Sequence, residues 1–231
     1  MTGGSPGIGL AIARTLLERG ARVAITANSD STLRNATREL ESVAGDEAVL
    51  ALRADVRRYE EVEQAVKDAV ARFGRLDILI NNAGVGIFSS VAQMSMEQWH
   101  QVIDTNLTGV FYCCRAAIPH LRASGAGWII NISSLASTNA FREAAAYCAS
   151  KAGLNAFTEA LMQEVRHDGI RVSYVMPGSV RTEFSGRTPG DDEGKLAPDD
   201  VAQAVADLLA HPARSLPSRV EIRPARPQKK G

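Results

Sequence analysis

From residue 8 onward, amphipathic helical segments alternate with short apolar segments, and this alternation restricts the fold more than any other feature. Strands this apolar need cover on both faces, so we predict an α/β fold with a doubly wound parallel sheet. The predicted helices cover residues 8–19, a polar stretch ending at residue 40, 59–73, 96–121, 143–166 and 199–210. The predicted strands cover residues 22–27, 48–54, 76–80, 128–132, 170–175 and 219–222.

The 231-residue chain has no internal repeat, no linker and no break in composition. We therefore expect a single domain over residues 1–223. Residues 224–231 are rich in Pro and Lys, and we expect them to form a flexible tail.

Composition excludes several classes of function. Lys+Arg 26 equals Asp+Glu 26, which argues against nucleic-acid or polybasic membrane-surface binding. No apolar run reaches the length of a membrane span, and the first residues do not resemble a signal peptide. The three Cys form no CxxC pair and the four His show no metal-ligand spacing, so we expect no metal site. These features predict a reduced, cytoplasmic protein.

A glycine-rich stretch leads directly into the first predicted helix. Glycines allow a backbone to turn tightly around a pyrophosphate, whose charge then lies at the helix N-terminus. A flexible Gly-rich terminus is the alternative, but the helix that follows at once favours a phosphate loop. The candidate cofactor-binding residues here are Gly3, Ser5, Gly7, Ile8 and Gly9.

The end of the next strand bears on the choice of dinucleotide. A carboxylate that binds the adenosine ribose is often found about 20 residues after the glycines, but this strand is followed by Asn28 and has no acid before Asp30. That absence leaves room for a 2′-phosphate and favours NADP. Because Pro6 and Asn28 supply no cation for that phosphate, NAD remains the alternative.

Tyr147 and Lys151 are four residues apart on a predicted helix, so their side chains share one face. An ammonium close to a phenol lowers the tyrosine pKa and makes Tyr147 a usable general acid or base. Chance pairing is the alternative, although only five of the 26 basic residues are Lys. Ser134 follows a strand closely, where its hydroxyl can meet a substrate carbonyl or simply cap a turn.

Taken together, these residues resemble the short-chain dehydrogenase/reductase family. The resemblance rests on Gly7-Ile8-Gly9, Asn82-Ala83-Gly84, Ser134, Tyr147-x-x-x-Lys151 and Pro177-Gly178, in that order, with 13 residues separating the serine from the tyrosine. It spans residues 2–222 and implies a Rossmann-like fold.

The resemblance also implies a role for each matching residue. Tyr147 would give a proton to the carbonyl oxygen, and Ser134 would orient that oxygen. Lys151 would lower the tyrosine pKa and hold the nicotinamide ribose, and Asn106 would position a water for proton relay. Further cofactor contacts are implied for Asn28, Asp55, Val56, Asn82, Ala83, Gly84, Tyr147, Lys151, Pro177, Gly178, Val180 and Thr182.

The implied function is hydride transfer between a nicotinamide cofactor, with NADP favoured, and a small ketone, aldehyde or secondary alcohol. The short polar segment at residues 183–198 favours a small substrate. The alternatives are an NAD-dependent alcohol dehydrogenase of the same fold and a truncated, non-catalytic binding or assembly partner. Small residues on the helices at residues 96–121 and 143–166 suit a homodimer or homotetramer.

The chain departs from the family at its first residues. The family has an apolar strand before the glycine loop, at the centre of the sheet, whereas this sequence has only Met1 there. Four buried aliphatic side chains contribute about 6–12 kcal/mol, comparable to a whole domain's stability. We therefore expect the first central strand to be largely missing from this chain, and Met1 to be an internal residue of a native chain that starts upstream.

Overall fold

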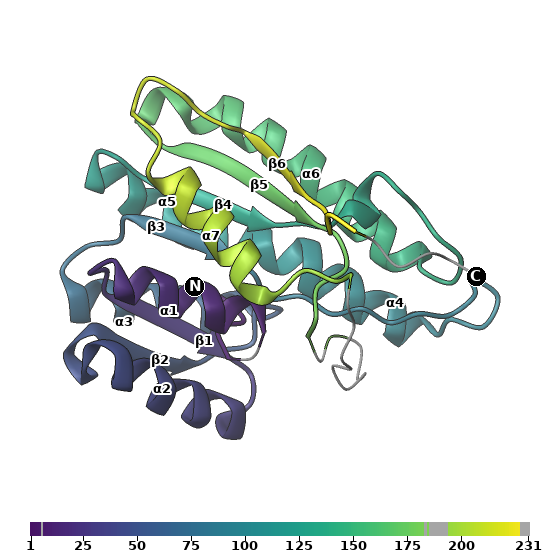
Figure 1. Cartoon of the computed structure of the whole chain (residues 1–231), viewed down its shortest axis with the longest axis horizontal. Coiled ribbons are helices and arrows are strands. Elements are labelled where there is room, and N and C mark those ends of the chain that lie inside the picture. Colours follow the sequence, from purple (N-terminus) through teal and green to yellow (C-terminus); the bar gives the residue numbers. More distant parts are fainter. Residues whose placement is uncertain (6, 183, 185–193, 227–231) are drawn as a thin grey trace.

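The strands form a parallel array that divides into two hydrogen-bonded sheets (Figure 1). The computed structural model describes residues 1–5, 7–182, 184 and 194–226. The smaller sheet pairs β1 with β2, and the larger has the order β3-β4-β5-β6. The strands are β1 (Val23–Ala27), β2 (Val49–Arg53), β3 (Ile78–Asn81), β4 (Trp128–Ile132), β5 (Arg171–Pro177) and β6 (Arg219–Ile222).

Thr2 connects the two sheets through isolated parallel bridges to Thr26 in β1 and Asn81 in β3. Its N–H donates to the C=O of Ile80 at 3.0 Å, while the C=O of Met1 accepts from the N–H of Thr26 at 3.0 Å. Beyond these two residues, no described segment occupies the central position between β1 and β3. The prediction of a largely missing first central strand is confirmed.

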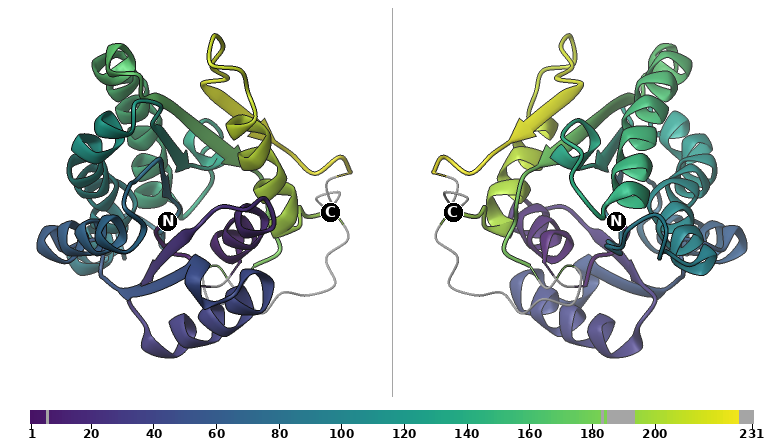
Figure 2. Two further views of the ribbon diagram at one scale, coloured as in Figure 1. Left: turned by 90° about the vertical axis from the view of Figure 1, so that its left-hand side faces the viewer. Right: turned by 90° about the vertical axis from the view of Figure 1, so that its right-hand side faces the viewer.

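Helices cover both faces of the array, as the side views in Figure 2 show. One apolar core joins the first face to α1 (Ile8–Glu18), α2 (Asp30–Ala44) and α7 (Pro198–Leu209). A second core joins the other face to α3 (Tyr59–Phe73), α5 (Gly109–Ser124) and α6 (Ala145–Val165). The remaining segments are α4 (Met96–Ile103), a π-helical turn η2 (Asp104–Thr108) and the 3₁₀ turns η1 (Asp46–Ala48), η3 (Leu135–Ser137) and η4 (Arg166–Asp168).

The predicted α/β fold is confirmed, with shifts at element ends. The helix predicted to end at residue 40 continues to Ala44, where Gly45 with φ 79° ends it. The helix predicted over residues 96–121 contains the π turn, which the apolar pattern does not reveal. Of the tail predicted over residues 224–231, residues 227–231 lie outside the described residues. No helix in the described part of the chain is long and apolar enough to cross a membrane.

Candidate active site

The loops that carry the predicted site residues follow the carboxyl ends of parallel strands, so they meet along one edge of the array (Figure 1). The glycine loop lies at the centre of this edge because Thr2 bridges β1 and β3. The structure therefore brings both predicted halves of the site, the phosphate loop and the Ser/Tyr/Lys group, to the same edge.

The glycine loop has the form of an anion cradle. Gly7 caps α1 with φ 66°, makes no side-chain cap and is followed by a first turn without acidic residues. A Cβ at Gly9 would lie 2.0 Å from the carbonyl oxygen of Gly3, so the loop closes on itself only with glycine there. Free helix N–H groups without a competing carboxylate suit a pyrophosphate, and the loop fits the predicted dinucleotide.

The turn after β3 is tied to this loop. The Thr2 hydroxyl accepts from the N–H groups of Asn82 and Ala83, both at 3.1 Å, and the Asn82 amide donates to the Gly3 carbonyl at 2.7 Å. A Cβ at Gly84 would lie 3.3 Å from Asn106 Oδ1 and 3.6 Å from Lys151 Nζ. The predicted Asn82-Ala83-Gly84 turn thus links the phosphate loop to the catalytic candidates.

The adenosine end of the predicted site is more open. Asn28 is exposed at the end of β1, and Asp55 follows β2, where its carboxylate binds the Arg57 guanidinium at 2.5–3.0 Å. These hydrogen bonds lower the pKa of Asp55. Val56 is buried, and a Cβ at Gly109 would lie 2.9 Å from it. Val56 therefore forms the floor beneath α5 as well as following Asp55.

The catalytic candidates come from β4 and α6. A hydrogen bond with Ser134 lowers the pKa of Tyr147, but burial acts more strongly and raises the pKa above its ordinary value of 10. Lys151 is buried and donates from Nζ to the Ile132 carbonyl at 2.8 Å, and burial lowers its pKa to about 8. The lowering of the Tyr147 pKa by Lys151 is not present in this structure, because desolvation dominates at both groups.

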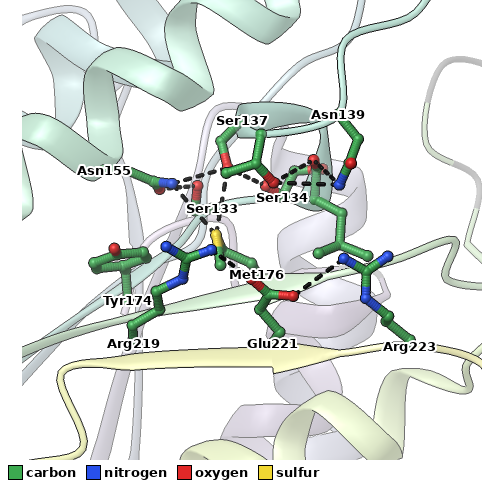
Figure 3. Close-up of polar contacts among 12 residues, drawn as sticks. Ser133, Ser134, Ser137, Asn139, Asn155, Tyr174, Met176, Arg219, Glu221 and Arg223 are labelled. Atoms are coloured by element: carbon green, nitrogen blue, oxygen red, sulfur yellow. Dashed lines mark hydrogen bonds and ion pairs between the residues drawn. The ribbon is translucent and has the colours of Figure 1, made fainter.

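Ser134 is held by a network beneath its turn, drawn in Figure 3. Its own hydroxyl accepts from the Ala136 N–H at 3.1 Å, the turn-cap role weighed from the sequence. The Ser137 hydroxyl donates to the Ser134 carbonyl at 2.6 Å and accepts from the Asn155 amide at 2.8 Å. Asn155 Oδ1 accepts from the Ser133 hydroxyl at 2.5 Å. The network fixes the β4–η3 turn to α6 and so sets Ser134 relative to Tyr147.

Replacing Asn155 with alanine tests this network. The substitution leaves the buried Ser133 hydroxyl without its carboxamide partner, which costs about 1–3 kcal/mol of unfolding free energy. A positioning role further predicts a fall in kcat of about tenfold or more with little change in cofactor affinity. Urea unfolding and a kcat-against-KM comparison measure both effects. An Asn155→Ala protein with unchanged kcat would limit the network to stability.

Asn106 lies in the π turn and is fully buried. Its Oδ1 accepts from the Val85 N–H at 2.8 Å, and its Nδ2 donates to the Val85 carbonyl at 2.9 Å and the Ser150 hydroxyl at 3.0 Å. The amide thus fastens the loop after Gly84 to α6. This is the backbone-satisfied asparagine considered from the sequence, and π turns often mark functional sites.

The last predicted cofactor segment follows β5. The Gly178 N–H donates to the Ile222 carbonyl at 2.8 Å, which ties the end of Pro177 to β6. Val180 bridges to Leu196. A Cβ at Gly7 would lie 3.0 Å from the Thr182 side chain, so this segment reaches the phosphate loop.

Aromatic rings surround Tyr147 that sequence reasoning missed. The Phe88 and Phe184 ring centroids lie 5.8 and 5.6 Å from the Tyr147 ring, and Phe141 lies 5.8 Å from Phe88. All three phenylalanines are partly exposed. No regular spacing in the sequence links them, because they come from three separate loops. They form an apolar wall beside the Tyr147 hydroxyl.

Comparisons with known proteins agree with this geometry. The sequence profile of the short chain dehydrogenase family matches residues 1–192. The chain is 34% identical over 225 residues to an uncharacterized oxidoreductase of Staphylococcus saprophyticus, covering 97% of this chain and 95% of the relative. This chain belongs to the short chain dehydrogenase family.

Solved structures add detail at the level of the fold. An alcohol dehydrogenase from the archaeon Thermococcus sibiricus, complexed with 5-hydroxy-NADP, is 31% identical with a TM-score of 0.91, covering 100% of this chain and 97% of the other. A metagenomic short-chain oxidoreductase in complex with NADP is 38% identical with a TM-score of 0.85, covering 97% and 96%. The family and the Rossmann-like fold implied by the motifs are thereby confirmed.

Proposed function

We propose that this protein is an oxidoreductase that transfers a hydride between NADP and a small ketone, aldehyde or secondary alcohol, with Tyr147 as the general acid and base. The observation that carries the proposal is the Ser134–Tyr147 hydrogen bond, one helical turn from buried Lys151, at the same edge as the glycine loop. A non-catalytic binding protein needs no such set. The dinucleotides named for the two structural neighbours support the cofactor class.

The nicotinamide supplies the hydride when bound, and the protein supplies alignment and the proton. In carbonyl reduction, the Tyr147 hydroxyl donates its proton to the substrate oxygen, and the Ser134 hydroxyl donates a hydrogen bond to the same oxygen. The raised pKa keeps Tyr147 protonated at neutral pH, which suits an acid. In alcohol oxidation the proton returns to Tyr147, so that direction gains as the pH rises.

Lys151 is the group that returns charge to this buried site. With a pKa of about 8 it is mostly protonated at neutral pH. It lies close to Gly84, where a nicotinamide ribose would pass, and Asn106 holds the adjoining loop. An ammonium there favours phenolate at Tyr147 once substrate and cofactor have closed the site to water.

Arg53 is our candidate for the cation that Pro6 and Asn28 do not supply. It ends β2 in register with Ala27, directly beside the loop that follows β1. Its Nε lies 3.7 Å from the Asp30 carboxylate, and its side chain is 68% exposed. The guanidinium is thus at the predicted adenosine ribose, able to meet a 2′-phosphate. NAD use remains the alternative, since Asp30 is also near.

Replacing Arg53 with alanine tests this assignment. We expect the Kd for NADPH to rise about tenfold, because one charge-assisted hydrogen bond to phosphate is lost. The Kd for NADH should change by less than about twofold, since NADH has no 2′-phosphate. Arg58→Ala is the matched control, because Arg58 is 70% exposed on the neighbouring loop. Equal losses for both dinucleotides would remove Arg53 from cofactor discrimination.

The phenylalanine wall beside Tyr147 favours substrates with an apolar substituent. Replacing Phe88 with alanine should raise KM for a small aromatic ketone about tenfold, because a contact of this size contributes about 1–3 kcal/mol. KM for a short aliphatic ketone is the internal control and should stay within about twofold. Initial rates on the two substrates give the ratio. An unchanged ratio would show that the wall does not contact the substrate.

The protein is placed in the cytoplasm as a homodimer or homotetramer. The free thiols of Cys113, Cys114 and Cys148 suit a reducing compartment. On α5, Phe111 is 43% exposed, which suits burial against a second copy.

The proposed activity is tested by following NADPH consumption with a panel of small ketones and aldehydes. Carbonyl-dependent oxidation of NADPH supports the proposal. Tight NADPH binding with no turnover of any carbonyl, and no reverse oxidation of the matching alcohols, would support a binding role instead.

A further inference from the structure

A second cavity lies away from the active-site loops, between β1 and β3. Its volume is about 340 Å³, more than twice that of an engineered 150 Å³ apolar cavity that binds benzene. It passes through the sheet from α1 to α3. Its lining is mostly apolar and includes Leu16, Val23, Ala65, Phe73, Ile78 and Ile80. We call this cavity the strand slot.

The backbone hydrogen bonds next to the strand slot follow a parallel pairing pattern that stops at Met1. The Met1 N–H donates to the Ala24 carbonyl at 2.6 Å, and its carbonyl accepts from Thr26. The Thr2 N–H donates to the Ile80 carbonyl. A central strand therefore pairs alternately with β1 and β3, one residue at a time.

Continuing this alternation backward identifies the next partners. The residue directly before Met1 would donate to the Ile78 carbonyl and accept from the Ile80 N–H. The residue before that would donate to the Arg22 carbonyl and accept from the Ala24 N–H. All four of these residues line the strand slot. Two more residues in the same register reach the level of Gly20 and Leu76, where the lining ends.

The charge at Met1 favours a peptide bond at this place. Its α-ammonium is enclosed by the slot, and burial lowers its pKa to about 6. Cys113 is the titratable group named as acting on it, and burial raises the pKa of that thiol to about 12, so it brings no negative charge at neutral pH. Arg22, Arg75 and Asp77 lie at the far end of the slot. A peptide N–H would donate to Ala24 without the cost of a buried charge.

We propose that the strand slot is a binding site for one extended apolar strand of about four residues, parallel to β1 and β3 and joined through its carboxyl end to Met1. The strand merges the two sheets into one. Its side chains alternate between α1 on one face and α3 on the other, so both faces call for Val, Ile or Leu. The site does not depend on cofactor or substrate.

The test compares three proteins that carry four added residues before Met1. The first addition is Val-Ile-Val-Ile, the second is a Gly/Ser sequence, and the third is Val-Ile-Val-Pro, whose proline lacks the N–H for Ile78. All three remove the Met1 charge, so differences among them report the strand alone. We expect the first addition to raise the thermal midpoint by about 10 °C over the second, with the third between them.

Hydrogen exchange locates the effect. The first addition should slow exchange of the Ala24 and Ile80 amides at least about 100-fold, whereas amides of β6, on the far edge, should gain only what global stability adds. A synthetic amidated Val-Ile-Val-Ile peptide, added in excess to the unextended protein, is the second arm should the extended protein not fold. Equal midpoints and unprotected Ala24 and Ile80 amides in both arms would overturn the proposal. Protection together with a doubled mass in solution would assign the slot to a strand exchanged between copies, and would overturn the joined strand.

Discussion

Replacing Tyr147 with phenylalanine should lower kcat for carbonyl reduction by about 10²–10⁴-fold, because general acid catalysis contributes about that much. The ring and its contacts with Phe88 and Phe184 remain, so only the hydroxyl that meets Ser134 is lost. The Kd for NADPH should stay within about twofold. Steady-state rates and a fluorescence titration measure the two quantities on one preparation.

Tyr59→Phe is the matched control for this substitution. The Tyr59 hydroxyl donates to Glu63 at 3.2 Å on α3, away from the catalytic turn. Its removal should leave kcat unchanged. A Tyr147→Phe protein that retains more than about a tenth of the wild-type kcat would contradict the assigned role.

Replacing Gly9 with alanine should weaken NADPH binding at least about 100-fold, equivalent to about 2.7 kcal/mol. The added Cβ would meet the Gly3 carbonyl oxygen at 2.0 Å and Asn82 Nδ2 at 2.5 Å. Because backbone cannot give way as a flexible side chain does, the loop must open, and the cradle at the start of α1 is lost. Isothermal titration measures the affinity.

Gly153→Ala is the control for the glycine substitution. Gly153 lies within α6, where a Cβ would meet only the flexible Leu107 side chain, at 3.1 Å. Alanine there should leave NADPH affinity unchanged. If Gly9→Ala bound NADPH as well as Gly153→Ala, the glycine loop would not be the phosphate site.

Period and composition were enough to predict the α/β alternation, because buried parallel strands and amphipathic helices have distinct patterns. Local motifs indicated Ser134, Tyr147, Lys151 and Asn106, which carry the chemistry at fixed spacings. These are the residues that the structure brings to one edge or fixes beside it. Their catalytic roles remain predictions that the substitutions above test.

Features formed by distant segments were not predictable in the same way. Asn155 supports Ser134 through Ser133 and Ser137, and a buried asparagine in a helix has no local signature. Phe88 and Phe184 meet Tyr147 only after folding. The pKa of Tyr147 also differs from expectation, because the helical spacing to Lys151 does not report how far burial desolvates both groups.

The most direct test of the dinucleotide site is a fluorescence titration of the purified protein with NADPH and then NADH. The account predicts micromolar binding of NADPH, tighter than NADH, with saturation at one equivalent per chain. Tighter binding of NADH would assign the cofactor to NAD and leave Arg53 without its proposed role. No binding of either dinucleotide by a folded protein, with or without the apolar strand before Met1, would contradict the assignment of the glycine loop and the loops beside it as a dinucleotide site.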